Sequence, residues 1–300
     1  MEAFWNRKTL LIKLYKRHLD MISRKEQEQI SQASVAVFGL GGVGGSAAIL
    51  CAKAGYGKLR LCDFDVYEES NIVEQEFANF KNLNTPKNVV VSQQLTNHSR
   101  HCQIESLNLE IKTVEEAKEF ICEADVVISA VDNAKAKILI DIASRDLGKP
   151  LFTASNIGWT VLYTSFVPDG YRFTDIYKGL PGLEQLHPLA LKFVELHHLV
   201  YFAVIGSFKV DYFRKLITGQ DDHLRYMATH AYIAAGFVVN EVNKYITGRA
   251  PVVKAPDSIA LDMLYNRQIN LSDYAAKIME ITLLVMQDSI DEACERFQSD

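Results

Sequence analysis

Short apolar runs alternate with segments of helical periodicity through the first half of the chain. Ser34 to Phe38 and Lys58 to Cys62 predict buried strands, and the small apolar residues from Ser46 to Ala54 predict a helix between them. A strand, a helix and a second strand within about 30 residues form a βαβ unit. The pattern therefore predicts an α/β fold that begins near residue 34.

The same alternation continues as far as residue 154. The further helices expected are Pro86 to His98, Val114 to Cys122 and Ala134 to Leu147, and the further strands are Gln103 to Leu109, Val126 to Val131 and Leu151 to Ala154. Repeated units of this kind form a doubly wound, mainly parallel sheet, and right-handed crossovers bring the carboxyl ends of its strands to one edge. We therefore expect a Rossmann-like fold.

The pattern changes on both sides of this region. Apolar positions at helical spacing predict one or two helices over residues 9–32, while Thr160 to Val167 alternates like an antiparallel strand. Residues 183–247 look largely helical with a break at residues 219–222, residues 258–261 resemble a late strand, and residues 273–297 predict one amphipathic helix. We expect an N-terminal helical segment over residues 1–33 and a mixed, helix-rich part over residues 155–300, in one compact domain with residues 34–154.

Composition limits the classes of partner. Apolar residues make up 48% of the chain and charged residues 23%, and the net charge is -5. Nucleic-acid binding favours basic surfaces, so we expect no nucleic-acid partner. The N-terminus does not resemble a signal peptide, and the longest apolar stretches, Val200 to Ile205 and Ala231 to Val239, are too short or too interrupted to span a bilayer. We expect a cytoplasmic protein without a membrane partner.

A glycine-rich loop separates the first predicted strand from the helix that follows. Gly39, Gly41 and Gly44 have the G-x-G-x-x-G spacing, which lets backbone N–H groups approach phosphate oxygens at the start of a helix. Asp63 ends the next strand, where a carboxylate can accept both ribose hydroxyls. The loop alone is compatible with NAD, FAD or ATP, and a purely structural glycine turn is the alternative.

The residues after Asp63 narrow this choice. The segment from Asp63 to Gln75, DFDVYEESNIVEQ, resembles the Asp-x-Asp-x-Val-x-x-Ser-Asn-x-x-Arg-Gln signature of the ThiF/MoeB/HesA family, relatives of the ubiquitin-activating enzymes. Further similar elements follow in the family's order: Tyr15 to His18, Thr85 to Lys87, Asp132 with Asn133, and the late helix from Thr229 to Gly248. The resemblance covers most of residues 10–250 and favours ATP.

This resemblance implies a reaction and a set of site residues. Family members use ATP and Mg²⁺ to adenylate a carboxylate, usually the C-terminal glycine of a ubiquitin-like protein, and they are commonly dimers. The resemblance assigns phosphate or nucleotide contacts to Gly39, Gly41, Gly42, Gly44, Asp65, Asn71 and Gln75, ribose to Asp63, phosphate charge to Lys87, Mg²⁺ to Asp132, and the neighbouring subunit's site to Arg17.

Three of these assignments have plain structural alternatives. Asp132 precedes a predicted helix and could cap its N-terminus. Lys87 could be a solvated helix residue, and Arg17 could be a surface charge. The roles implied for Lys87, Asp132 and Arg17 fit the chemistry, because lysine, arginine and Mg²⁺ stabilise the charge that develops on leaving pyrophosphate.

Glu74 departs from the family signature, which has arginine at this position. A carboxylate about 4 Å from a phosphate charge would cost roughly 4 kcal/mol per pair at an effective dielectric near 20. We therefore expect Glu74 to point away, to bind a second metal ion, or to pair with a basic neighbour such as Lys81. Altered or lost catalysis is the other consequence, in which case the chain is a non-catalytic nucleotide-binding subunit.

Cysteine is the second departure. The five cysteines stand at positions 51, 62, 102, 122 and 294, in no C-x-x-C pair, and residues 155–250 contain none. Thioester-forming relatives place their nucleophile in a segment after the sheet, so we expect neither a protein thioester nor a zinc site. His187, His197 and His198 have no recognised ligand spacing and are more easily explained as packing residues. Trp159 could be a lid over the site or part of the core.

The sequence therefore predicts Mg²⁺- and ATP-dependent adenylation of a carboxylate. The acceptor would be a peptide, a small protein or a metabolite, and the acyl-adenylate would be used directly by a homodimer. A non-catalytic subunit is the first alternative. An NAD- or FAD-dependent oxidoreductase is the second, and it would leave Lys87, Asp132 and the Ser70-Asn71 element unexplained.

Overall fold

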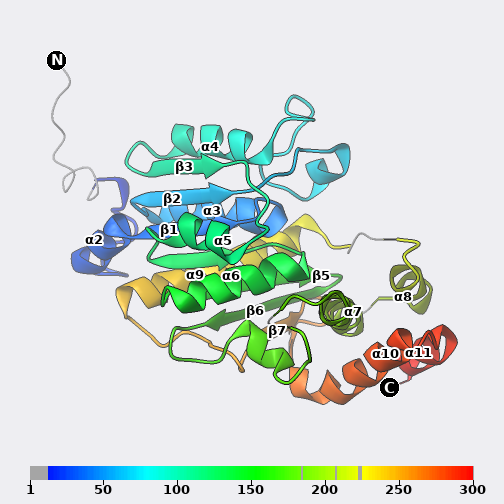
Figure 1. The fold of residues 1–300 in the computed structure, drawn as a ribbon. Coiled ribbons are helices and arrows are strands. Elements are labelled where there is room, and N and C mark those ends of the chain that lie inside the picture. Colours follow the sequence, from blue (N-terminus) through cyan, green and yellow to red (C-terminus); the bar gives the residue numbers. More distant parts are fainter. Residues whose placement is uncertain (1–12, 184, 207, 222–224, 300) are drawn as a thin grey trace.

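A single eight-stranded sheet organises the chain (Figure 1). The computed structural model describes residues 13–183, 185–206, 208–221 and 225–299. The strand order is β3-β2-β1-β4-β5-β6-β7-β8. The strands are β1 (Ser34–Phe38), β2 (Lys58–Cys62), β3 (Gln103–Leu107), β4 (Val126–Ser129), β5 (Leu151–Ile157), β6 (Thr160–Phe166), β7 (Ile259–Asp262) and β8 (Arg267–Ile269).

The sheet has a parallel half and an antiparallel half. Strands β3, β2, β1, β4 and β5 are parallel to one another, whereas β6, β7 and β8 add on in antiparallel fashion. The expected Rossmann-like, mainly parallel sheet is confirmed, including the antiparallel strand after β5. Its parallel half brings the carboxyl ends of β1, β2 and β4 to one edge, where ligands bind in open sheets of this class.

Helices cover both faces of the sheet. They are α2 (Arg24–Gln32), α3 (Gly42–Ala54), α4 (Lys87–His98), α5 (Val114–Ile121), α6 (Ala134–Asp146), α7 (Pro188–Ile205), α8 (Val210–Ile217), α9 (Ala228–Thr247), α10 (Ala275–Met286) and α11 (Ile290–Gln298), with short 3₁₀ helices η1 (Glu69–Val73), η2 (Phe173–Tyr177) and η3 (Leu271–Tyr274). Figure 1 shows α5 and α6 in front of the strands and α3 and α9 behind them. Both faces of the sheet are therefore shielded from water at β1 and β4, whereas the edge strand β3 is partly exposed.

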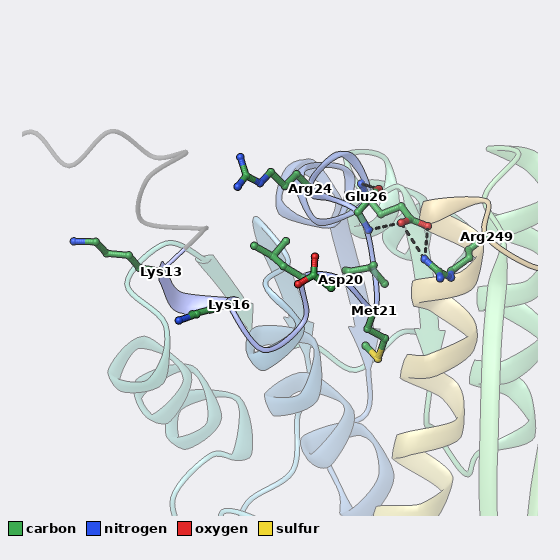
Figure 2. A pocket seen from close by; sticks show the side chains of 10 residues that line it. Lys13, Lys16, Asp20, Met21, Arg24, Glu26 and Arg249 are labelled. Atoms are coloured by element: carbon green, nitrogen blue, oxygen red, sulfur yellow. Dashed lines mark hydrogen bonds and ion pairs between the residues drawn. The ribbon is translucent and has the colours of Figure 1, made fainter.

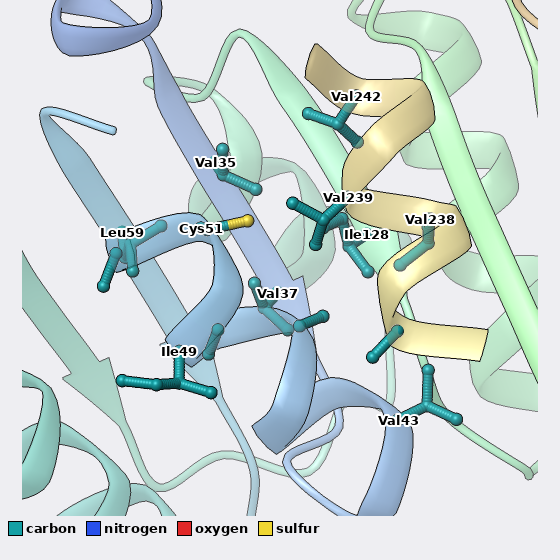
Figure 3. Close-up of a cluster of buried hydrophobic side chains, with 14 of the residues drawn as sticks. Val35, Val37, Val43, Ile49, Cys51, Leu59, Ile128, Val238, Val239 and Val242 are labelled. Carbon is teal, nitrogen blue, oxygen red and sulfur yellow. The ribbon is translucent and has the colours of Figure 1, made fainter. Parts of the chain in front are cut away.

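Every residue of β1 is buried, and its side chains alternate between two apolar layers. Val35 and Val37 pack with α3 and α9 (Figure 3), while Ala36 and Phe38 pack with α5 and α6. The continuous apolar run of this strand follows from burial on both faces. The layer behind the sheet fixes α3, the helix that follows the glycine loop.

Small side chains let α3 and α9 approach each other closely. Ala47 and Ala48 on α3 and Ala231, Ala234 and Ala235 on α9 are fully buried. Residues from the C-terminal part of the chain thus complete the core behind the glycine loop.

Three details differ from the sequence-based expectation. Residues 273–297 form two helices, not one, because Asp288 adopts a left-handed φ of 62° between α10 and α11. The break predicted at residues 219–222 is confirmed between α8 and α9, but the helical stretch 183–247 has a further interruption, after Ile205, that was not expected. The short strand β8 was not expected; its three residues, Arg267 to Ile269, are too few to show a period.

Helix α7 contains the Val200 to Ile205 stretch that looked too short to span a bilayer. Its 18 residues make it, among the helices in the described ranges, the one long and apolar enough by length and composition to do so. Such a signal is weak, since a core helix of a soluble protein passes the same test. Ala190 and Val194 of this helix are buried in the layer in front of the sheet, and Val200 and Ala203 in a cluster with α8, α10 and α11.

Candidate functional site

The glycine loop is a tight turn that excludes side chains at two positions. Gly39 has a φ of 80°, and a Cβ there would lie 2.7 Å from the carbonyl oxygen of Ala130. A Cβ on Gly44 would lie 1.8 Å from the carbonyl oxygen of Gly39. Gly41 is the N-cap of α3 and provides no side-chain cap, so the helix's first N–H groups point toward the loop. Helix α3 begins at Gly42, four residues before the predicted start.

Asp63 ties the glycine loop to the end of β2. It is 7% exposed; its Oδ2 accepts the N–H of Leu40 at 2.6 Å and its Oδ1 accepts that of Asp65 at 2.7 Å. Burial raises the pKa of this carboxyl, and the two backbone donors oppose the rise. Each oxygen keeps a lone pair for a further donor such as a ribose hydroxyl. The sequence predicted the ligand role; the structural role toward Leu40 depends on a contact it could not show.

Lys87 is directed toward the same edge by Asp65. Its Nζ lies 3.2 Å from Asp65 Oδ2, and its backbone N–H donates to the carbonyl of Asp65 at 2.8 Å. Lys87 is only 7% exposed although it stands in the first turn of α4. The alternative of a solvated helix residue is therefore wrong.

Glu74 lies against the glycine loop. Its Oε2 accepts the hydroxyl of Tyr226 at 2.5 Å, and its Oε1 accepts the amides of Gln75 at 2.8 Å and Asn71 at 3.4 Å. A Cβ built on Gly42 would lie 2.9 Å from Oε2. The side chain therefore does not point away from the loop.

Pairing of Glu74 with Lys81 is also wrong, because its partners in the described chain are these hydroxyl and amide groups. Asn71 and Gln75, predicted to line the polyphosphate, donate to this carboxylate instead. The Tyr226 contact joins residues 152 positions apart.

Asp132 stands exposed at the end of β4, just before α6. The N-cap of α6 is Asn133, whose Oδ1 accepts the N–H of Ala136 at 3.0 Å. Asp132 is therefore not the helix cap. The segment that leads to Asp132 lies against the glycine loop, because a Cβ on Gly39 would lie 3.2 Å from the backbone nitrogen of Val131. Burial raises the pKa of the Tyr226 hydroxyl, and the charges of Glu74 and Asp132 raise it further.

The donors at this edge fit Mg²⁺ as it is usually held beside a nucleotide. No group of three His, Cys, Asp or Glu side chains that could hold a metal by itself occurs among the described residues. Mg²⁺ needs only one or two carboxylates when phosphates and waters complete its coordination. Asp132 can supply one such ligand.

Arg17 is remote from its own chain's loop. The neighbouring Tyr15 donates or accepts a 2.8 Å hydrogen bond with His101 and packs beside Gly55, which caps the C-terminus of α3. The glycine loop is at the other end of that 13-residue helix, about 20 Å away. Arg17 is exposed there.

A cavity of about 650 Å³ also adjoins the N-terminal segment (Figure 2). Its walls are Lys13, Lys16, Leu19, Asp20, Met21, Ile22, Ser23, Arg24, Glu26 and Arg249. Arg249 pairs with Glu26 at 3.1 Å and follows the C-terminus of α9. The N-terminus of α9 lies at the glycine loop, since Ala231 Cβ would be 3.2 Å from a Cβ on Gly42. The cavity and the glycine loop are therefore at opposite ends of α9.

Three histidines in the second half of the chain, His187, His197 and His198, have structural roles. His187 caps α7, accepting the N–H of Leu189 at 3.3 Å. His197 bonds to the Tyr177 hydroxyl at 3.1 Å, and His198 stacks on Phe173 at 5.3 Å. Burial lowers the pKa of both.

Trp159 is 39% exposed and packs against His230 at 5.4 Å. It lies in the turn between β5 and β6, half in contact with the core and half open. The two interpretations of this residue, lid and core, both remain compatible with that position.

Three side chains near the site escaped the sequence analysis: Tyr226, Asn156 and Lys137. Asn156 is 7% exposed and is the second-to-last residue of β5. Lys137 lies one turn into α6 with its ammonium 5.7 Å from the ring centre of Phe202, and burial lowers its pKa to about 8. Of these three residues, only Lys137 could have been suspected from the sequence, because it is a cation five residues after Asp132.

A Rossmann-like sheet with this loop and these strand-end carboxylates defines an α/β nucleotide-binding protein. The chain belongs to the ThiF family, whose model matches residues 15–277. The resemblance stated from the motifs is thereby confirmed.

Curated relatives match about half of the chain. The sulfur carrier protein ThiS adenylyltransferase of Escherichia coli (strain K12) is 35% identical over 141 residues, 47% of this chain and 56% of that protein. The molybdopterin-synthase adenylyltransferase of Haemophilus influenzae is 29% identical over 155 residues, 51% of this chain and 63% of that protein. The match thus spans less than two thirds of either relative.

Solved structures resemble a larger part of the chain. A structure of PaaA has a TM-score of 0.66 and 19% identity, covering 90% of this chain and 76% of PaaA. A structure of Escherichia coli MccB with ATP has a TM-score of 0.66 and 16% identity, covering 89% of this chain and 72% of MccB. At these identities the likeness establishes the shared fold.

Proposed function

We propose that this chain uses Mg²⁺ and ATP to adenylate a carboxylate of a peptide, a small protein or a metabolite. One observation carries the proposal: a buried lysine, Lys87, is directed by Asp65 to the sheet edge that also holds the glycine loop, Asp63 and Asp132. Binding of a dinucleotide alone would leave Lys87 and Asp132 together unexplained.

The reaction transfers the adenylyl group. A carboxylate oxygen attacks the α-phosphorus of ATP, the bond to the bridging oxygen of the β-phosphate breaks, and pyrophosphate leaves. The loop N–H groups and Lys87 offset the charge that develops on pyrophosphate. When bound at Asp132, Mg²⁺ adds Lewis-acid stabilisation of the same charge.

The acyl-adenylate would then react directly with the final nucleophile. That nucleophile attacks the acyl carbon and AMP leaves with the bonding electrons. Residues 155–250 contain no cysteine that could accept the acyl group first. The relatives named for sulfur carrier protein ThiS and for molybdopterin synthase, and the MccB structures with MccA, favour a protein or peptide as the carboxylate donor.

The proposal includes a homodimer in a cytoplasmic setting, without nucleic-acid or membrane partners. The resemblance assigns Arg17 to a neighbouring subunit's site, and its position agrees with this, because an exposed arginine about 20 Å from its own loop could reach a nucleotide only in another chain. Mixing Arg17→Ala with Asp132→Ala chains tests this: a homodimer that shares residues should regain activity in the mixture.

ATP–pyrophosphate exchange tests the reaction. Exchange should appear with a peptide or carrier protein that presents a C-terminal carboxylate, and it should disappear in Asp132→Ala. Lys135→Ala, in the first turn of the helix that follows Asp132, is the control and should retain exchange. ATP binding without exchange for any carboxylate would contradict adenylation.

A non-catalytic nucleotide-binding subunit is the second candidate, and Glu74 is the observation that favours it. Under that interpretation Mg²⁺-ATP binds weakly or not at all, and Glu74→Arg creates exchange where the natural chain has none.

An NAD- or FAD-dependent oxidoreductase is the third candidate. It would require a nicotinamide or flavin that remains bound through purification.

A further inference from the structure

Glu74 is held by hydrogen bonds at the position where the family signature has an arginine. Three donors fix its carboxylate: the Tyr226 hydroxyl at 2.5 Å, the Gln75 amide at 2.8 Å and the Asn71 amide at 3.4 Å. Its Oε2 lies against Gly42, the first residue of α3. This position is the phosphate end of the loop, so the carboxylate faces any polyphosphate that binds there.

The charge of this end differs from the family pattern by two units. An arginine contributes one positive charge, and Glu74 contributes one negative charge. A nucleotide polyphosphate adds several negative charges to the same place. One divalent cation restores the missing two charges, whereas a rotation of Glu74 would restore only part and would break three hydrogen bonds.

Two buried polar atoms around Glu74 have no hydrogen-bond partner within the described part of the chain. Gln75 is 9% exposed and its amide carbonyl oxygen, Oε1, is unpaired although its amide nitrogen bonds to Glu74. The hydroxyl of Tyr67, a fully buried residue whose pKa the charge of Glu74 raises, is unpaired as well. Unpaired buried polar groups are rare and mark places where a ligand completes the bonding.

A second carboxylate reaches the same place from another strand. The segment that leads to Asp132 lies against the glycine loop, because a Cβ on Gly39 would lie 2.7 Å from the carbonyl oxygen of Ala130 and 3.2 Å from the backbone nitrogen of Val131. The charges of Asp132 and Glu74 both raise the pKa of the Tyr226 hydroxyl, which agrees with this placement. Two carboxylates, an unpaired amide oxygen and phosphate oxygens are the hard oxygen ligands that Mg²⁺ and Mn²⁺ favour.

We propose that Glu74 holds a second divalent cation in place of the family's arginine. This ion would share the Asp132 carboxylate and the nucleotide's polyphosphate with the first. Gln75 offers its free Oε1 to this ion or to one of its waters, and Tyr226 keeps the Glu74 carboxylate oriented. The inference rests on the proposed nucleotide site, because the ion is complete only with phosphate oxygens.

Counting metal ions tests the inference on the full chain. Mn²⁺ is titrated in the presence of saturating α,β-methylene-ATP, and the free ion is measured by electron paramagnetic resonance. The natural chain should bind two Mn²⁺ per nucleotide, and Glu74→Gln should bind one. In a plot of the logarithm of nucleotide affinity against the logarithm of Mn²⁺ concentration, the slope should be about two for the natural chain and about one for Glu74→Gln.

Glu76→Gln is the matched control. Glu76 also accepts a tyrosine hydroxyl, from Tyr232 at 2.5 Å, but it is exposed and outside the loop. This variant should still bind two Mn²⁺ per nucleotide. Loss of an ion in Glu76→Gln as well would contradict a specific site at Glu74.

The outcomes separate this inference from the proposed function. One Mn²⁺ per nucleotide in both the natural chain and Glu74→Gln overturns the second site but leaves adenylation standing. Tighter metal-free nucleotide binding in Glu74→Gln, with the number of ions unchanged, also overturns it and makes Glu74 a competitor of phosphate. No nucleotide binding at any Mn²⁺ concentration overturns both.

Discussion

The two ends of the candidate nucleotide site are built differently. At the ribose end, Asp63 is buried and accepts two backbone N–H groups, from Leu40 and Asp65. At the polyphosphate end, Glu74 is held by the side chains of Tyr226, Gln75 and Asn71. Backbone donors are present whatever the sequence, whereas side-chain donors change with single substitutions. The ribose end therefore retains the family pattern, while the polyphosphate end has room to diverge.

The largest effect is expected from removing the cation at the polyphosphate end. Lys87→Met should lower the rate of ATP–pyrophosphate exchange by about 100- to 1000-fold, the usual loss for a preorganised charge-stabilising donor. Nucleoside binding at the ribose end should change little. Lys81→Met, an exposed lysine in the preceding loop, is the control and should leave the rate unchanged. Equal losses in the two variants would contradict a specific role for Lys87.

The glycine loop joins the two ends, and its geometry predicts a large loss of stability in Gly44→Ala. The added Cβ would lie 1.8 Å from the carbonyl oxygen of Gly39, so the backbone must shift. We expect a loss of about 3 kcal/mol in the free energy of unfolding, measured in urea. Gly236→Ala is the control: that glycine is in α9 with nothing within 4 Å of a Cβ, and it should gain about 0.5–1 kcal/mol. Similar changes in the free energy of unfolding for Gly44→Ala and Gly236→Ala would contradict a loop that excludes a side chain.

Lys137, beside Asp132 at the polyphosphate end, should make stability depend on alkaline pH. Burial lowers its pKa from 10.5 to about 8, and Asp132 opposes this. Because the folded-state pKa lies below the unfolded one, the ammonium costs stability fully below about pH 8, and the cost fades toward pH 10.5.

The full shift would correspond to about 3 kcal/mol, and the partial exposure of Lys137 reduces it. Lys137→Met should thus be more stable than the natural chain near pH 7 by roughly 1–2 kcal/mol, with the difference shrinking as pH rises. Urea unfolding at several pH values measures it. A difference that does not change with pH would contradict the buried ammonium.

The smallest effect concerns acid at the ribose end. Burial raises the pKa of Asp63 above its ordinary 3.8, so protonation begins at a higher pH than for an exposed aspartate. Adenosine, which has no phosphate, should bind about twofold more weakly at the pH where half of Asp63 is protonated. Calorimetry with adenosine at decreasing pH measures this.

The raised pKa of Asp63 also affects the stability of the fold, and here protonation is favourable, whereas it weakens adenosine binding. The ionised carboxyl of Asp63 costs stability above its raised pKa, and this cost disappears as pH falls through it.

Asp63→Asn is the control for the binding experiment and should bind adenosine weakly at every pH. Adenosine binding in the natural chain that is flat down to pH 4 would contradict the raised pKa.

Much of the fold and part of the site could be predicted from the sequence. The parallel strands could be predicted because strands buried on both faces are continuously apolar. Asp63 could be predicted because it follows the end of a strand, and Lys87 and Asp132 through the resemblance to the family's ordered motifs. Tyr226 could not, since its contact with Glu74 joins distant segments. The direction of the Glu74 side chain depends on the same contact. The boundary between α10 and α11 was not predicted, because the apolar period of the sequence continues on both sides of Asp288.

The close packing of α3 on α9 has a consequence for how the chain can be divided. A polypeptide ending at residue 154 would contain the glycine loop, Asp63, Lys87 and Asp132, yet it would lack α9 and leave the buried alanines of α3 facing water. We expect this fragment alone to be unable to acquire a stable tertiary structure. Supplied together with a second polypeptide of residues 155–300, it should assemble, as in split-protein complementation. Nucleotide affinity would then report the reunion of the two pieces.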